Sequence, residues 1–385
     1  MKVVNVEIIV VGAPWRELVY VEVTTESGYR GLGEVRILNK TDVLISCVEE
    51  LAQRHLIGRE ASDLSALHWD VQVADYSVPG EIVQSALAAL DVACWDIMGQ
   101  ALEVPVWKLL GGRFRNSVPA YANAWYQGDR VISLIAERAA QVVARGYRGL
   151  KIDPFGAASA EISYRDRREA VELLTAIRDA VGPEVELFVE MHGRFTASTA
   201  LRIADEIAAI EPAWIEEPVP PGDLNGYRNV RQGTNIPIAT GERIHTAREL
   251  IPYVEEGLVD VLQVDLTHHG GITGLQRLIG WADAYNVLIA PHNVCGPIGT
   301  AAALHVGVAC SNFKILEHFN DFADAWVLDT VRGAPRVDDA GSFTVPTASG
   351  LGLQIDREVC ARHPRTGGRL DLFASGWERR EAPRG

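Results

Sequence analysis

Three short apolar runs in this chain each end in a carboxylate, and they do so at an even interval. Glu216 lies 26 positions after Glu190, and Glu242 lies 26 positions after Glu216. One strand–helix unit of a β/α barrel takes about 30 residues, since roughly 250 residues make eight units. The interval therefore predicts three neighbouring parallel strands with a carboxylate at the end of each. Because like charges at such distances repel, we expect a divalent cation there, and an all-oxygen site suits Mg²⁺.

The same alternation of strand and helix continues before and after these three runs. Eight apolar runs have the length of buried strands, with helical stretches between them: 118–123, 149–153, 185–190, 214–217, 238–242, 259–265, 287–292 and 314–318. This order favours a parallel β/α barrel over a doubly wound sheet. We expect the barrel to occupy residues 118–330.

Residues 1–117 have a different pattern, which predicts a separate α+β domain. Two strand-like runs, 18–24 and 31–35, flank a hairpin turn signal. Helical patterning then extends over residues 41–110.

The barrel pattern lapses after about residue 330. We expect residues 331–385 to form a segment that returns to the first domain, with a strand within 346–356. Residues 376–385 predict a loose tail.

Further chemically active side chains lie at the carboxyl ends of the predicted strands, where β/α barrels build their sites. Four of them come from the second, sixth, seventh and eighth strands: Lys151, Asp265, His292 and Glu317. Asp265 could hold one ring nitrogen of His292 and leave the other free as a base. His192 is four strands away from His292 in a ring of eight, so the two imidazoles would face each other across the metal.

Composition excludes several classes of partner. The formal net charge of −15 at pH 7 argues against nucleic-acid binding. We find no apolar run long enough to span a bilayer, and Met1 leads directly into strand-like sequence rather than a signal peptide. An odd number of cysteines without zinc-type spacing favours a reducing cytoplasm; they are Cys47, Cys94, Cys295, Cys310 and Cys360. We expect a cytoplasmic protein that acts on a small molecule and binds neither nucleic acid nor membrane.

Taken together, these motifs resemble the enolase superfamily, in the mandelate racemase subgroup, along nearly the whole chain. The features that carry the resemblance are Leu109-Leu110-Gly111-Gly112, Lys151, Glu190, Glu216 in Ile-Glu-Glu-Pro, Glu242 in Gly-Glu-Arg, Asp265, His292 and Glu317. The resemblance implies a modified TIM barrel of the (β/α)7β type, capped by an α+β domain that the N-terminal region and the C-terminal segment form together. Loops near Ala13–Glu17 of the cap should determine specificity. It also implies a symmetric homo-oligomer.

The resemblance further implies a carboxylate substrate that binds Mg²⁺ and loses its α-proton. Two positions depart from the family pattern. Glu190 stands where the first metal ligand is usually Asp, and Asp153 stands where many members have a second lysine as a base. The second departure argues against a two-base racemase. His192-Gly193-Arg194 instead is similar to the sugar-acid dehydratases that resemble galactonate dehydratase, in which that histidine protonates the departing hydroxyl.

We therefore predict a Mg²⁺-dependent dehydratase of a sugar acid that forms a 2-keto-3-deoxy acid. His292, oriented by Asp265, would remove the C2 proton, and His192 would protonate the C3 hydroxyl. Lys151 and Glu317 would help Mg²⁺ to stabilise the enediolate. Further candidates for substrate contacts are Asp153, Arg194 and His269. Two alternatives stay open: an epimerase, racemase or cycloisomerase that uses the same enediolate, and a non-catalytic barrel that binds a metal and a sugar acid.

Overall fold

The computed structural model describes residues 1–74, 76 and 78–380. Its N-terminal part, the cap, contains an antiparallel sheet in the order β1-β2-β3, made by β1 (Val3–Gly12), β2 (Glu17–Thr25) and β3 (Arg30–Val35). The helices of the cap are α1 (Thr41–Leu51), the π-helix η1 (Ala52–Leu56), α2 (Leu64–Ala74), α3 (Glu81–Ala101) and α4 (Val106–Leu109). The expected hairpin and the helical stretch after it are both present.

Helix α3 is the central helix of the cap and packs closely against β3. A Cβ at Gly33 would lie 2.0 Å from the carbonyl oxygen of Ala89, so only glycine permits this approach. Contrary to the expectation from sequence, α3 is long and apolar enough to cross a membrane by length and composition. However, 78% of that stretch is buried inside the protein, which accounts for its apolar character.

The central part of the chain forms a ring of parallel strands. In sheet order from β4 to β10 each strand pairs with the next, and β11 pairs with β4. The strands are β4 (Ser117–Ala122), β5 (Gly149–Ile152), β6 (Glu186–Glu190), β7 (Trp214–Glu216), β8 (Ile238–Thr240), β9 (Val261–Leu262), β10 (Leu288–Ile289) and β11 (Leu316–His318). The ring closes because Ile289 in β10 accepts a backbone hydrogen bond from Lys314 at 2.7 Å and donates one to Asn312 at 2.9 Å.

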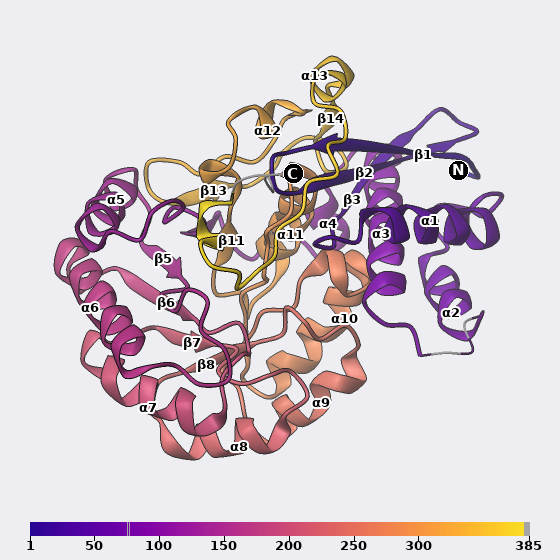
Figure 1. The fold of residues 1–385 in the computed structure, drawn as a ribbon. Helices are drawn as coiled ribbons and strands as arrows, with labels where there is room; N and C mark the ends of the chain where they lie inside the picture. The colour runs from indigo at the N-terminus through magenta and orange to yellow at the C-terminus, as the bar shows by residue number, and fades with distance from the viewer. Residues whose placement is uncertain (75, 77, 381–385) are drawn as a thin grey trace.

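Helices connect these strands and cover the outside of the ring (Figure 1). They are α5 (Ile132–Ala144), α6 (Tyr164–Val181), α7 (Ala197–Ile207) with η2 (Ala208–Ile210), α8 (Leu224–Gly233), α9 (Ala247–Glu255), η3 (Leu266–His268) with α10 (Gly271–Ala284), and α11 (Pro297–Ala309); η4 (Asn320–Phe322) and α12 (Trp326–Asp329) follow β11. The predicted fold class, a modified TIM barrel with a cap, is confirmed.

Large aromatic side chains fill the barrel beneath the strand ends. Alternate residues of a strand share a face, so Phe188 points the same way as Glu190, and Trp214 the same way as Glu216. The rings of Phe188 and Trp214 stack with centroids 3.8 Å apart, and Tyr121 packs edge-on against both. This buried layer supports the carboxylates from below.

The C-terminal residues contact both parts of the molecule. They form β12 (Val331–Arg332), β13 (Ser342–Thr344), β14 (Gln354–Ile355), α13 (Arg357–Arg362) and η5 (Trp377–Arg379). β13 pairs with β4 of the barrel, and β14 pairs with β12. The strand expected within 346–356 is therefore only two residues long, and it does not join the cap sheet. The C-terminal segment contacts that sheet further along the chain, where the carbonyl of His363 accepts a hydrogen bond of 3.0 Å from the N–H of Gly12.

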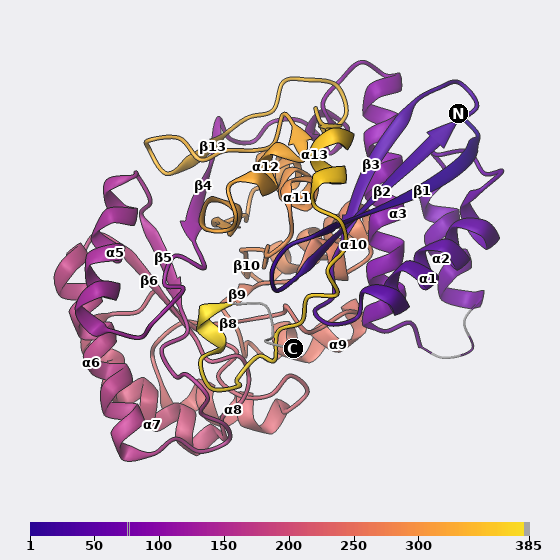
Figure 2. The same cartoon turned by 45° about the horizontal axis from the view of Figure 1, so that its top comes forward.

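The last described residues cover the end of the barrel (Figure 2). Trp377 is 4% exposed and donates to the carbonyl of Gly156 at 3.1 Å, while Glu378 pairs with Arg130 at 2.9 Å. Residues 376–380 are thus not the loose tail that the sequence predicts, and residues 381–385 lie outside the described part of the chain.

We expect Phe188→Ala to lower the free energy of unfolding by about 3–5 kcal/mol, because a cavity replaces the ring stacked on Trp214. Phe114→Ala is the matched control, since Phe114 is 63% exposed. Denaturant unfolding of the three proteins measures the difference. Equal midpoints for the two variants would show that the aromatic layer does not stabilise the barrel.

Candidate active site

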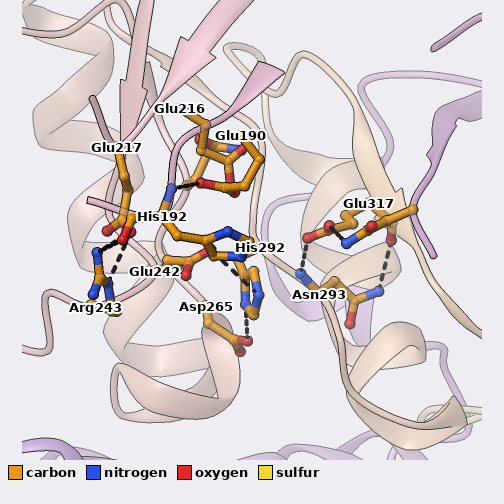
Figure 3. A network of polar contacts seen from close by, with 12 residues as sticks. Glu190, His192, Glu216, Glu217, Glu242, Arg243, Asp265, His292, Asn293 and Glu317 are labelled. Carbon is orange, nitrogen blue, oxygen red and sulfur yellow. Dashed lines mark hydrogen bonds and ion pairs between the residues drawn. The ribbon is translucent and has the colours of Figure 1, made fainter. Parts of the chain in front are cut away.

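Three neighbouring strands bring the carboxylates of Glu190, Glu216 and Glu242 together. Glu190 and Glu216 are the last residues of β6 and β7 and pair in register, and Glu242 lies two residues after β8. One oxygen from each carboxylate lies within 4.8 Å of the others (Figure 3). Although glutamate at position 190 is one methylene longer than aspartate, its carboxylate therefore still lies beside those of Glu216 and Glu242.

Lys151 holds this cluster together from β5. Its Nζ lies 2.5 Å from Glu216 Oε1 and 3.2 Å from both Glu190 Oε2 and Glu317 Oε1. Burial opposes the charge of Lys151, but Glu216 and Glu317 outweigh it and raise the pKa of the ammonium well above its ordinary value. Lys151 therefore stays charged and offsets part of the repulsion between the carboxylates.

The carboxylates fit a divalent cation. Burial raises the pKa of Glu190 to about 7; the positive charge of Lys151 lowers it in part, and the like charge of Glu242 adds to the increase. Glu190 Oε2 is buried and accepts no hydrogen bond in the described structure; its one charged neighbour named above is Lys151, at 3.2 Å. Three clustered carboxylates are the donor set of a hard cation rather than of a thiol- or imidazole-binding metal.

His292 and Asp265 form a hydrogen-bonded pair in the loops after β10 and β9. His292 Nδ1 lies 2.7 Å from Asp265 Oδ2, and Thr267 fixes the other oxygen of Asp265 through its backbone N–H at 2.8 Å and its hydroxyl at 2.7 Å. The second ring nitrogen, Nε2, faces Glu242 Oε2 at 3.6 Å. The pair thus leaves one nitrogen directed at the carboxylate cluster.

The charge around His292 controls its protonation. Burial would lower the pKa of the imidazole, but Glu242 and the bond to Asp265 raise it to about 10. Because Glu242 belongs to the candidate metal site, this effect is largest when no cation balances its charge.

His192 lies on the β6 side of the cluster in a strained backbone conformation. Its φ is 47°, in the left-handed region, which costs roughly 1–3 kcal/mol for a non-glycine residue. Two contacts hold it there: its N–H donates to Glu190 Oε1 at 2.6 Å, and Arg243 Nη2 donates to its carbonyl at 2.7 Å. Its Nδ1 lies 2.6 Å from Asp153 Oδ2.

Asp153 also forms an ion pair with Arg194. Burial opposes its charge, but Arg194 and His192 keep the pKa of Asp153 below its usual range. Of the three candidates for substrate contacts, Asp153 thus contacts His192 directly, and Arg194 is linked to it through Asp153. A direct contact of either with substrate stays a prediction.

The other two predicted residues lie in different surroundings. Glu317 accepts from Asn123 Nδ2 and from the backbone N–H of Asn293, both at 2.7 Å, and so completes the rim beside Lys151. His269 lines a cavity of about 460 Å³ between the cap and the barrel, together with His245 and Arg248. Its predicted contact with substrate stays untested.

Sequence reasoning missed the ion pair between Glu217 and Arg243. Glu217 is fully buried with a φ of 44°, and Arg243 Nη2 lies 2.6 Å from its Oε2. A Cβ at Gly193 would lie 2.1 Å from Arg243 Nη2, so the glycine admits the guanidinium. In the sequence, this ion pair is visible only as an acidic residue next to Glu216 and a basic residue next to Glu242. Only the fold brings the two neighbours together.

Comparison with known proteins agrees with this geometry. Residues 6–111 match the mandelate racemase / muconate lactonizing enzyme N-terminal domain, and residues 134–359 match the enolase C-terminal domain-like family. The chain belongs to the enolase superfamily. The family predicted from the sequence is confirmed, and with it the prediction of an enzyme.

Relatives of enolase-superfamily type cover most of this chain. A D-gluconate dehydratase of Thermoproteus tenax is 36% identical over 346 residues, 90% of this chain and 69% of the relative. A D-gluconate/D-galactonate dehydratase of Picrophilus torridus is 33% identical over 275 residues, 71% of this chain and 70% of the relative. The crystal structure of a mandelate racemase/muconate lactonizing enzyme-like protein from Roseovarius sp. TM1035 superposes with a TM-score of 0.90, 31% identity and 96% coverage of both chains.

We expect Glu216→Gln to weaken Mg²⁺ binding, because the cluster loses one of its three negative charges. Isothermal titration with MgCl₂ measures the affinity, and Mg²⁺ should raise the thermal unfolding temperature of the wild type far more than that of the variant. Glu186→Gln is the control, since Glu186 pairs with Lys314 at the opposite end of β6. Wild-type affinity in Glu216→Gln would contradict the metal site.

Asp265→Asn should lower turnover by about 10²–10⁴-fold while the fold persists, because an amide no longer selects the tautomer of His292. Activity per folded molecule and thermal unfolding are measured on one preparation. Loss of thermal stability with activity retained would make Asp265 a structural residue only.

Proposed function

We propose that this enzyme is a Mg²⁺-dependent sugar-acid dehydratase that forms a 2-keto-3-deoxy acid. The observation that carries the proposal is the presence of two imidazoles at one carboxylate cluster, each fixed by its own aspartate. His292 is fixed by Asp265, and His192 by Asp153. An elimination of water needs both a base for the C–H proton and an acid for the leaving hydroxyl. The dehydratases among the relatives support the same reaction class.

Glu190, Glu216 and Glu242 would hold the metal. When bound, Mg²⁺ supplies positive charge that polarises the substrate carboxylate and makes the neighbouring C–H bond more acidic. Lys151, charged and buried, adds a second fixed positive charge at the same place. These charges are preorganised, so the protein need not rearrange as negative charge develops.

In the proposed reaction, His292 Nε2 takes the C2 proton, and the electron pair of that bond passes first into the substrate carboxylate and then into the C2–C3 double bond. The C3–O bond breaks as His192 gives its proton to the hydroxyl, which leaves as water. The resulting enol tautomerises to the 2-keto-3-deoxy acid. The sum of these steps is the loss of one water molecule, with both imidazoles returned to their starting states after proton exchange.

The contacts of Asp153 weigh against racemisation with two bases. Asp153 stands at the position where a second lysine would act as a base, and its carboxylate is paired with His192 and Arg194.

An acid-sugar library incubated with Mg²⁺ and assayed for 2-keto acids tests the function. Exchange or isomerisation without keto acid would favour an epimerase or cycloisomerase, and binding without any reaction a non-catalytic barrel.

His192→Asn should uncouple the two halves of the reaction. In D₂O this variant should exchange deuterium into C2 of a true substrate, because His292 and the metal site remain, while keto acid formation falls by at least about 10²-fold. NMR of recovered substrate measures the exchange.

His292→Asn is the matched comparison and should show neither exchange nor product. Exchange lost in His192→Asn and retained in His292→Asn would reverse the two roles. Elimination that survives intact in His192→Asn would remove the acid role from this residue.

A further inference from the structure

The peptide group between His192 and Gly193 is bound at both of its polar ends. The carbonyl of His192 accepts a hydrogen bond of 2.7 Å from Nη2 of Arg243, and the N–H of Gly193 donates one of 2.7 Å to the carbonyl of Glu217. Glu217 and Arg243 also form an ion pair, with Nε of Arg243 2.9 Å from Glu217 Oε2 (Figure 3). We call Glu217 and Arg243 the peptide clamp.

The backbone at this peptide group needs such support. The φ angles of His192 and Gly193 are 47° and 54°, so two successive residues lie in the left-handed region. Glycine adopts this conformation readily, but a histidine keeps it only where the surrounding structure holds it. The carbonyl and the N–H of a trans peptide point in opposite directions. Because the clamp binds both, the peptide group cannot rotate without breaking a hydrogen bond.

The orientation of this peptide group determines where the imidazole of His192 lies. With residue 192 in the left-handed conformation, its N–H reaches Glu190 Oε1 and its Nδ1 reaches Asp153 Oδ2, both at 2.6 Å. An extended conformation, which would continue strand β6, directs the N–H and the side chain differently. In the described part of the chain, the clamp side chains form no hydrogen bond to the ring itself. The clamp therefore acts on the imidazole through the backbone.

The clamp also joins His192 to the candidate metal site. Each clamp residue is next in sequence to a candidate metal ligand, Glu217 to Glu216 and Arg243 to Glu242. The backbone of Glu217 is held in turn by strand β8, because its N–H donates to the carbonyl of Ala239 at 2.9 Å. Residues that follow β7 and β8 thus fix the position of a histidine that follows β6.

We propose that Glu217 and Arg243 are positioning residues for His192, which hold its imidazole where it can give a proton to the leaving hydroxyl. The inference rests on the proposed function for the role of that imidazole. His292 is fixed separately, by Asp265. The clamp should therefore serve the departure of the hydroxyl and not the removal of the C2 proton.

Arg243→Gln tests this division with a sugar acid that the wild type dehydrates. Keto acid formation should fall by at least about tenfold, because the imidazole of His192 is displaced from the hydroxyl. In D₂O, deuterium should still enter C2, as it should in His192→Asn, because His292 and the metal ligands remain. Arg243→Lys should recover part of the keto acid formation, since an ammonium group can still donate to the carbonyl of His192.

Arg231→Gln is the matched control and should change neither quantity. It removes a guanidinium that binds one carboxylate, Asp260, at 2.7 Å, directly before β9 and thus at the end of the barrel away from the site. Arg243→Gln leaves the buried carboxylate of Glu217 without its partner, which is destabilising. The double variant Glu217→Gln/Arg243→Gln removes that charge as well and should show the same selective loss of keto acid formation.

Two kinetic outcomes would overturn the inference. An equal fall of deuterium exchange and keto acid formation would assign Arg243 to the metal site rather than to His192. A higher KM with kcat unchanged would make Arg243 a direct contact of the substrate.

A measurement without substrate separates this inference from the proposed function. An ionised carboxylate only accepts hydrogen bonds, so Nδ1 of His192 carries the proton that it shares with Asp153. NMR of protein labelled with ¹⁵N-histidine follows the exchange of this ring proton with water. Arg243→Gln should speed the exchange by at least about tenfold, because a displaced ring opens to water more often. The ring proton between His292 and Asp265 should keep its rate and serves as the internal reference.

The two readouts distinguish the possible failures. Faster exchange at His192 alone supports the clamp even if no acid is dehydrated, in which case the proposed function fails. Unchanged exchange at His192, in a wild type that does dehydrate sugar acids, would refute the clamp and leave the proposed function intact. Equal acceleration at His192 and His292 would show a general loosening of the site and would also refute the clamp.

Discussion

The structure depends on one buried ammonium group among carboxylates. Lys151 lies within 3.2 Å of Glu190, Glu216 and Glu317, and its charge makes their close approach possible. One cation cannot balance the whole cluster, because Glu242 adds a fourth carboxylate; burial, together with the like charge of Glu242, raises the pKa of Glu190. The site therefore combines a fixed positive charge with room for a second one. The aromatic layer of Phe188 and Trp214 keeps water from relieving the repulsion from below.

Much of this arrangement could be predicted from the sequence, because it follows from regular spacing. The even interval between Glu190, Glu216 and Glu242 indicated three adjacent strands, and parallel strands end at the same edge of a barrel. The pairing of Asp265 with His292 followed from the same reasoning, since their strands are neighbours. Local periodicity and the order of elements were sufficient for these conclusions.

The remaining contacts depend on loop conformations that no periodicity encodes. Asp153 contacts His192, which adopts a left-handed conformation, and the sequence pattern did not indicate this pair; the substrate contact of Asp153 stays a prediction. Arg243 reaches Glu217 only because Gly193 has no side chain. The C-terminal residues were the least predictable, since their order comes from contacts such as that of Trp377 with Gly156 rather than from a strand or a long helix.

The position of that C-terminal segment has a practical consequence. Phe373 and Trp377 lie against the ring of His192, with centroids 5.5 and 6.0 Å away. The segment that ends the described chain therefore packs against a candidate catalytic side chain, although it is far from β6 in sequence. A truncation before residue 373 would remove both aromatic contacts. Protein engineering of this enzyme should therefore keep residues 373–380 intact.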